Sequence, residues 1–264
     1  MTHRPRKRFG QNFLHDESVV YNILAAIDAR PDQHLVEIGP GQGALTAALL
    51  DSGAALDIVE LDRDLVALLQ RKYQHRDNLR IHSADALQFD FCSLAAMPAR
   101  RLRIIGNLPY NISTPLLFHL LENSACIEDM HFMLQKEMVD RLCAKPGSKQ
   151  YGRLSLMVQY HCSSEQLFEV PPESFTPAPK VMSAVIRLTP HSKPPVAIDD
   201  HKDFQQIVTQ AFSQRRKTLR NPLKKMLSAE EIAGLGIDPG LRAEALSLQE
   251  FAALSNLWTK KRQA

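Results

Sequence analysis

Four consecutive residues, Asn107-Leu108-Pro109-Tyr110, combine an amide side chain, a proline-stiffened turn and an aromatic ring at the end of an apolar run. This set suits the activation of a planar, conjugated amino group. The exocyclic nitrogen of adenine is a poor nucleophile because its lone pair is delocalised into the ring. An acceptor on Asn107 and a carbonyl oxygen of the turn would bind its two hydrogens, while Tyr110 stacks on the base. A strand end with a packed tyrosine is the structural alternative.

A glycine-rich segment, residues 37–43 (EIGPGQG), separates an expected strand from an expected helix. Glycines there allow a tight turn and a close approach of the backbone to a ligand, and the helix that follows offers free amides. The segment also satisfies the dinucleotide-binding pattern, and Glu60 lies near the spacing of a ribose-binding acid. A nicotinamide-dependent dehydrogenase is therefore one interpretation of this loop.

Asp85 follows the third expected strand, where an S-adenosylmethionine-binding protein needs an acceptor for the adenine amino group. A helix N-cap is the structural alternative for this aspartate. A dehydrogenase gives no reason for the Asn-Leu-Pro-Tyr turn after the fourth strand. The order of these features therefore favours a methyltransferase that uses S-adenosylmethionine.

The elements that must position these residues alternate along the first two-thirds of the chain. Such alternation predicts an α/β fold with a Rossmann-like, S-adenosylmethionine-dependent methyltransferase sheet. We expect residues 154–160 and 182–188 to form a late pair of strands. The other expected strands are 35–38, 56–59, 79–82, 102–105 and 130–134, and the expected helices are 17–27, 44–50, 64–72, 115–121 and 136–143.

A proline-containing segment that begins at Pro190 predicts a linker, and the pattern beyond it is helical. We therefore expect two domains. Residues 1–189 would form the methyltransferase domain with its basic N-terminal segment, and residues 190–264 a small all-α domain that binds RNA or the ribosome. Its expected helices are 204–212, 223–227, 230–235 and 248–258.

Composition and residue spacing limit the classes of protein and of site that the chain can contain. No apolar run is long enough to span a bilayer, so we expect no membrane association. The four cysteines lack CxxC spacing, which indicates neither a zinc site nor a disulfide framework, and the histidines show no ligand-like spacing. We expect a cytoplasmic protein in a reducing compartment, without a metal and monomeric.

Basic residues are concentrated in two runs, although the net charge is only +3. Solvated surfaces often carry such runs, but two runs of one sign beside a base-handling motif favour phosphate binding. The expected RNA-binding residues are Arg4, Arg6, Lys7 and Arg8 at one end, and Arg215, Arg216, Lys217, Arg220, Lys224 and Lys225 near the other.

Four motifs together resemble the rRNA adenine N6,N6-dimethyltransferase family over essentially the whole chain. They are Gln11-Asn12-Phe13-Leu14, the glycine-rich segment, the Asn-Leu-Pro-Tyr turn and residues 175–181 (FTPAPKV). The resemblance implies transfer of four methyl groups from S-adenosylmethionine to N6 of two adjacent adenosines. These adenosines lie in the 3′-terminal hairpin loop of 16S rRNA in the small (30S) ribosomal subunit. A role in subunit biogenesis is also implied.

The resemblance also implies roles for single residues. Glu60 would hold the ribose hydroxyls, Asp85 the adenine amino group, and Phe175 would cover the target base opposite Tyr110. From the residues alone, Phe175 is better explained as core. The expected cofactor-binding residues are Gln11, Asn12, Leu14, Gly39, Gly41, Glu60, Asp85 and Asn107, and the expected catalytic residues are Asn107, Leu108, Pro109, Tyr110 and Phe175.

The expected mechanism is direct in-line attack of adenine N6 on the sulfonium methyl group, with acceleration from alignment and from the acceptors at the turn. Two alternatives stay open besides the dehydrogenase. One is an erythromycin-resistance type enzyme acting on large-subunit rRNA, which residues 214–219 (QRRKTL) disfavour. The other is an RNA-binding assembly or transcription factor without catalysis, which Glu60, Asp85 and Asn107 disfavour.

Overall fold

The computed structural model describes residues 11–95, 100–109 and 112–263, which form two compact units. The first unit comprises residues up to Val139 together with Ser164–Pro190. The second comprises Asp140–Ser163 and the residues from His191 onward. Five residues with expected roles lie outside the described ranges: Arg4, Arg6, Lys7, Arg8 and Tyr110.

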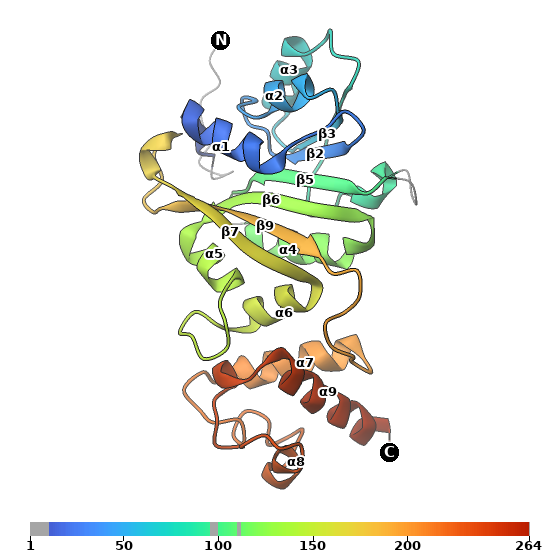
Figure 1. Cartoon of the computed structure of the whole chain (residues 1–264), viewed down its shortest axis with the longest axis vertical. Helices are drawn as coiled ribbons and strands as arrows, with labels where there is room; N and C mark the ends of the chain where they lie inside the picture. The colour runs from blue at the N-terminus through green and yellow to red at the C-terminus, as the bar shows by residue number, and fades with distance from the viewer. Residues whose placement is uncertain (1–10, 96–99, 110–111, 264) are drawn as a thin grey trace. The chain divides into compact units, whose positions relative to one another are not determined.

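A seven-stranded sheet forms the centre of the first unit, with the strand order β4-β3-β2-β5-β6-β9-β7. Strands β4, β3, β2, β5 and β6 are parallel, and β9 pairs antiparallel with β6. Figure 1 shows β3, β2, β5, β6 and β9 following one another in this order. The predicted Rossmann-like sheet is confirmed. Its strands are β2 (His34–Ile38), β3 (Ala55–Glu60), β4 (Leu79–Ser83), β5 (Leu102–Asn107), β6 (Ile127–Gln135), β7 (Cys162–Val170) and β9 (Ser183–Pro190).

Helices connect the parallel strands, and local capping sets where several of them begin. The Asp16 side chain accepts hydrogen bonds from the Ser18 and Val19 amides and starts the first helix. Asp62 caps the third helix through the Asp64 amide. These helices are α1 (Glu17–Ile27), α2 (Thr46–Asp51), α3 (Arg63–Lys72), α4 (Ser113–Glu122) and α5 (Lys136–Leu142), with short 3-10 turns at η2 (Phe91–Leu94), η3 (Ser124–Cys126) and η4 (Pro172–Ser174).

The expected strand at 154–160 is wrong, because this segment is helix α6 (Arg153–His161). Its alternating sequence, LSLMVQY, resembles a strand, but five residues of the helix are buried, on more than one face. The Ser155 hydroxyl accepts a hydrogen bond from the Gly152 amide and supports the helix start. The strand of this region is β7, which directly follows α6 and neighbours β9 in the sheet.

The described residues after Pro190 contain helices and turns but no strand of the sheet, as predicted. They form α7 (His201–Phe212), α8 (Ala229–Gly234), the 3-10 turn η5 (Ala243–Ala245) and α9 (Leu248–Gln263). The expected helix at 223–227 is wrong, since these residues form turns with only a few helix-like bonds. The predicted domain boundary is incomplete as well, because Asp140–Ser163 belongs to the second unit although it precedes the linker.

Two of the four cysteines form a disulfide, which corrects the expectation that none would pair. Cys92 lies in η2 and Cys126 in η3, 34 residues apart, and their Cα atoms are separated by 5.6 Å. This proximity arises from tertiary structure and leaves no signal in the cysteine spacing. No helix within the described ranges is both long enough and apolar enough to cross a membrane.

His131 on β6 generates a prediction about stability. Its side chain is buried, and neither ring nitrogen has a hydrogen-bond partner among the described residues. Burial lowers its pKa to about 4, against the attraction of Asp129. The unfolded chain therefore binds a proton that the folded chain excludes between pH 6.5 and 4, so stability falls as the pH falls through this window. The shift corresponds to about 3 kcal/mol.

We predict that His131→Leu removes this component of the acid sensitivity. Chemical denaturation of wild-type protein and variant at several pH values between 4 and 7 measures it. The difference in unfolding free energy should change by about 3 kcal/mol in favour of the variant as the pH falls. A difference that stays constant with pH would contradict the prediction.

Candidate active site

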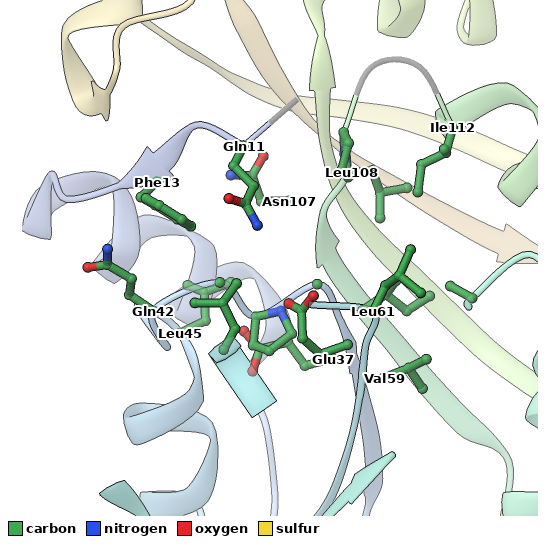
Figure 2. A pocket seen from close by; sticks show the side chains of 18 of the residues that line it. Gln11, Phe13, Glu37, Gln42, Leu45, Val59, Leu61, Asn107, Leu108 and Ile112 are labelled. Atoms are coloured by element: carbon green, nitrogen blue, oxygen red, sulfur yellow. The ribbon is translucent and has the colours of Figure 1, made fainter. Parts of the chain in front are cut away.

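A cavity with a volume of about 260 Å³ opens at the carboxyl ends of the parallel strands in the first unit. Residues from the ends of β2, β3 and β5, from the loop after β4 and from strand β1 (Phe13–Leu14) line it. In Figure 2, Phe13 and Gln42 lie on one side of the cavity, and Leu108 and Ile112 lie on the opposite side.

The cavity lies where the strand order reverses between β2 and β5, the place where ligands bind in open α/β sheets. The two strands pair in parallel, and Ile38 at the end of β2 faces Gly106 near the end of β5. A Cβ atom on Gly106 would come within 2.9 Å of the Ile38 carbonyl oxygen and 2.8 Å of the Leu108 side chain. The absence of a side chain at Gly106 therefore lets β2 and β5 pair closely up to the point where the glycine-rich loop and the Asn107 turn begin.

The N-terminal segment closes one side of the cavity against the glycine-rich loop. Gly41 has a φ of +59°, and a Cβ atom there would lie 3.0 Å from the Phe13 ring. Strand β1 pairs antiparallel with β8 (Phe175–Thr176), and the Asn107 side-chain nitrogen donates a 3.2 Å hydrogen bond to the Asn12 carbonyl oxygen. Residues about 95 positions apart in the chain thus meet at one wall.

Two buried carboxyl groups make the cavity favourable for a cation. Burial raises the pKa of Glu37 to about 7, although the Thr46 hydroxyl donates to it at 2.7 Å. Burial also raises the pKa of Glu60, against a hydrogen bond from the Asp62 amide. Because burial disfavours the charged form of each group, and the charge of Glu60 raises the pKa of Glu37 further, a positively charged ligand would relieve this electrostatic cost.

Asp85 lies on the cavity wall formed by the loop after β4. One of its carboxylate oxygens accepts a 2.9 Å hydrogen bond from the Leu87 amide, which fixes the turn. A carboxylate has two oxygens with several acceptor positions, so the side chain can hold the turn and still accept from a ligand. Asp85 therefore holds a turn and does not cap a helix, since the next helical element, η2, begins at Phe91 with Asp90 as its N-cap. The ligand-binding interpretation of Asp85 stays a prediction.

The oxygen atoms of the Asn107-Leu108-Pro109 turn differ in whether they already accept hydrogen bonds from the protein. Since Asn107 donates through its nitrogen to Asn12, its side-chain oxygen remains an acceptor. The Pro109 carbonyl oxygen already accepts from the Ile112 amide at 3.1 Å and the Ser113 hydroxyl at 2.9 Å. Within the described ranges, no hydrogen bond reaches the Leu108 carbonyl oxygen. The second acceptor offered by the turn is therefore Leu108 rather than Pro109.

Most of the predicted cofactor-binding and catalytic residues come together at this cavity. The lining includes every expected cofactor-binding residue and three of the expected catalytic residues: Gln11, Asn12, Leu14, Gly39, Gly41, Glu60, Asp85, Asn107, Leu108 and Pro109.

Phe175 departs from its expected position over the target base. Its side chain is only 3% exposed, packs in the hydrophobic core and does not line the cavity. The pairing of β8 with β1 sets this position, because Phe175 faces the buried Leu14. The interpretation of Phe175 as a core residue, made from the residues alone, fits the structure better.

Arg215, one of the expected RNA-binding residues, has partners within the protein. It lies in the second unit, where its guanidinium donates to the Lys149 carbonyl oxygen at 2.8 Å and contacts Glu244 at 3.8 Å.

Phe13, Leu61 and Ile112 are among the apolar cavity residues that were not predicted. Phe13 lies within a motif that was recognised, but a single aromatic side chain carries no signal for its direction. Leu61 directly follows Glu60 and is 51% exposed, which is unusual for a leucine at a strand end. Ile112 follows the Asn107 turn and lines the cavity opposite Phe13.

The sheet order, the glycine-rich loop at the switch point and the acids after the next strands define a Rossmann-like methyltransferase that uses S-adenosylmethionine. The family model described as "Ribosomal RNA adenine dimethylase" matches residues 2–260. The chain belongs to this family, and it is an rRNA adenine dimethyltransferase. The dehydrogenase interpretation of the glycine-rich loop is therefore wrong.

Curated relatives match nearly the whole chain. Proteins named ribosomal RNA small subunit methyltransferase A share 57% identity in Pseudomonas syringae pv. syringae strain B728a and 58% in Pseudomonas aeruginosa strain PAO1. The first alignment covers 98% of this chain and 96% of the relative, and the second covers 96% and 94%.

Two solved structures share the fold at 24% sequence identity. A dimethyladenosine transferase from Plasmodium falciparum has a TM-score of 0.79, with 95% of this chain and 98% of that chain covered. The 23S rRNA methyltransferase ErmE has a TM-score of 0.74, with 94% and 100% covered.

The contact between Gly106 and β2 generates a prediction about stability. We expect Gly106→Ala to lower the unfolding free energy by about 1–3 kcal/mol, because the new methyl group meets the Ile38 backbone. Gly234→Ala is the matched control, since a Cβ atom there meets nothing within 4 Å and the helix gains propensity. Denaturant titration of both variants measures the difference. Equal stabilities of the two variants would contradict the prediction.

Proposed function

We propose that the protein transfers methyl groups from S-adenosylmethionine to N6 of two adjacent adenosines in the 3′-terminal hairpin loop of 16S rRNA, within the small ribosomal subunit. The observation that carries this proposal is the pair of acceptors on Asn107 and Leu108 at the edge of the cofactor cavity. The names and identities of the curated relatives support the small subunit as the substrate. We further propose a role in subunit biogenesis and a monomeric, cytoplasmic protein.

The cavity residues fit S-adenosylmethionine, which supplies a methyl group on a positively charged sulfur. Glu37 and Glu60 would provide negative charge beside a cationic ligand, which would favour their ionised forms, and Glu60, the last residue of β3, would accept from ribose hydroxyls. Asp85 can accept from an adenine amino group through the oxygen that the Leu87 amide does not use. Leu61, at the edge of the cavity, offers an apolar surface beside these acids.

Asn107 and Leu108 would orient the target amino group. Before the first transfer the two acceptors would bind both hydrogens of N6, and before the second transfer one acceptor would bind the hydrogen that remains. These contacts favour pyramidal geometry at nitrogen and restore its lone pair. The lone pair forms the new bond to the methyl carbon as the bond from carbon to sulfur breaks, S-adenosylhomocysteine leaves, and the nitrogen then loses a proton to solvent. Positive charge develops on this nitrogen as its new bond forms, so fixed acceptors stabilise the transition state more than the ground state. The target base must leave its stack, or already be unstacked in a loop, to reach these groups. Tyr110 remains the expected stacking residue, outside the described ranges.

We predict that Asn107→Ala lowers the rate of methyl transfer by about 10²–10³-fold, the range expected when a transition-state hydrogen bond is removed. Binding of S-adenosylmethionine should remain measurable by calorimetry, because the acids of the cavity are intact. Asn22→Ala, at an exposed position of α1, is the matched control. Wild-type turnover in the Asn107 variant would exclude the proposed role.

The substrate assignment is tested with S-adenosylmethionine carrying a labelled methyl group. Unmethylated small subunits and large-subunit rRNA are offered separately, and the product nucleosides are identified. We expect N6,N6-dimethyladenosine from the small subunits and no label in large-subunit rRNA. Label confined to large-subunit rRNA would overturn the proposal in favour of an erythromycin-resistance type activity. No label in either RNA would favour an RNA-binding factor without catalysis.

A further inference from the structure

The charge of the protein is divided unequally between the two units. The second unit contains 16 lysines and arginines and 9 acidic residues, a net charge of +7, whereas the first contains 16 and 20, a net charge of −4. The excess positive charge is therefore confined to the second unit. Part of it lies in a loop that the family motifs do not include, residues 144–150 (AKPGSKQ) between α5 and α6.

Residues 144–150, here called the lysine loop, are hydrogen-bonded to two other segments of the second unit. The Arg215 guanidinium donates to the Lys149 carbonyl oxygen at 2.8 Å, and the Gly147 amide donates to the Glu244 carbonyl oxygen at 2.7 Å. Arg215 also lies 3.8 Å from the Glu244 carboxylate. The lysine loop, the segment that contains Arg215 and the segment that contains Glu244 are thus joined by these three contacts. Arg215 takes part in two of them.

The side chains of Lys145 and Lys149 remain at the surface while their backbone is held. Both residues are exposed, and neither forms an ion pair with a described residue. Residues 144–153 contain three cationic side chains and no acid. A fixed backbone with free ammonium groups suits the binding of phosphates, because little chain entropy is lost when the lysines bind.

Arg215 brings this loop beside a second basic segment. Residues 213–225 carry six cationic side chains and no acid, and Arg216 and Lys217 directly follow Arg215. The side chains of Arg216 and Lys217 are exposed and form no ion pair with a described residue. Arg215 differs from them, since its guanidinium is engaged by a carbonyl oxygen and a carboxylate.

We propose that Lys145 and Lys149 form an additional phosphate-binding segment for rRNA, and that Arg215 is the positioning residue that holds this segment beside Arg216 and Lys217. This inference deepens the proposed function and rests on it for the identity of the RNA. A polyanion with a flexible backbone is the partner that two adjacent, acid-free basic segments fit best.

The first experiment compares Lys145→Ala/Lys149→Ala with wild-type protein in salt titrations of binding to unmethylated small subunits. The control is Lys193→Ala/Lys202→Ala, which removes the same charge at exposed positions, one in the linker and one at the start of α7. Each phosphate contact adds about 0.7–0.9 to the slope of log affinity against log salt. The ratio of the wild-type affinity to the affinity of the loop variant should therefore be about tenfold smaller at 200 mM than at 50 mM salt.

The control variant should keep the wild-type slope within about 0.3, because its lysines contact no phosphate. Equal slopes for all three proteins would overturn the proposal and return Lys145 and Lys149 to a solvated surface or to an acidic protein partner. An equal loss of slope in the loop and control variants would also overturn it, since net charge alone would then explain the effect.

The second experiment tests whether Arg215 acts through the loop. Arg215→Ala should weaken binding in the wild-type background but have less than a twofold further effect when Lys145 and Lys149 are already alanine. Hydrogen exchange at the Gly147 amide should become faster in Arg215→Ala, because its segment is released. Full additivity of the two losses, with unchanged exchange, would show that Arg215 is itself a phosphate ligand and would refute its positioning role.

Failure of this inference can be separated from failure of the proposed function. If wild-type protein does not methylate small subunits, the proposed function fails, whatever the slopes are. If wild-type protein methylates small subunits but the loop variant keeps the wild-type slope, only the phosphate-binding segment is refuted.

Discussion

The site depends on one close backbone contact, the approach of β5 to β2 at Gly106. Ile38 and Gly106 are paired in the parallel ladder, and a Cβ atom at Gly106 would nearly touch the Ile38 carbonyl oxygen. The strand order reverses on the two sides of this pair, so the loops after β2 and β5 leave in different directions and open a crevice. The glycine-rich loop borders one side of that crevice and the Asn107 turn the other. The cofactor site and the base-orienting site are adjacent for this reason.

Two buried carboxyl groups on adjacent strands, those of Asp57 and Glu37, differ in how the protein compensates their burial. Asp57 on β3 is fully buried, and burial alone would raise its pKa, but hydrogen bonds from His34 and His82 and the charge of Arg80 hold that pKa below its usual value. Burial raises the pKa of Glu37, on the adjacent strand, to about 7, because the Thr46 hydroxyl and the charge of Lys72 offset the burial only in part. The partners of Asp57 come from the protein itself. A cationic ligand in the cavity would favour the charged form of Glu37.

The sequence was sufficient for the features that depend on local pattern. The bounds of α1 match the expected helix at 17–27, and the strands that lead to Glu60 and Asn107 lie where the apolar runs predicted them. Periodicity was insufficient for α6, where burial on several faces removes the helical alternation of apolar and polar residues. The disulfide, the buried position of Phe175 and the bonds of Arg215 arise from segments distant in the chain. No local signal encodes such contacts, so neither the basic run that contains Arg215 nor the family motif that contains Phe175 indicated the partners that these side chains have in the fold.

The two units carry net charges of opposite sign. This difference affects which part of an RNA, its backbone or a base, can enter the cavity. The two buried carboxyl groups of the cavity, where ionised, and the net charge of −4 on the first unit would disfavour phosphates inside the cavity. The net positive charge of the second unit would attract the RNA backbone. An uncharged base is the part of the RNA that the cavity does not repel, and Asn107 and Leu108 offer it acceptors. A base can separate from its phosphates in this way only when it is unstacked, and this requirement favours adenosines in a hairpin loop over paired ones.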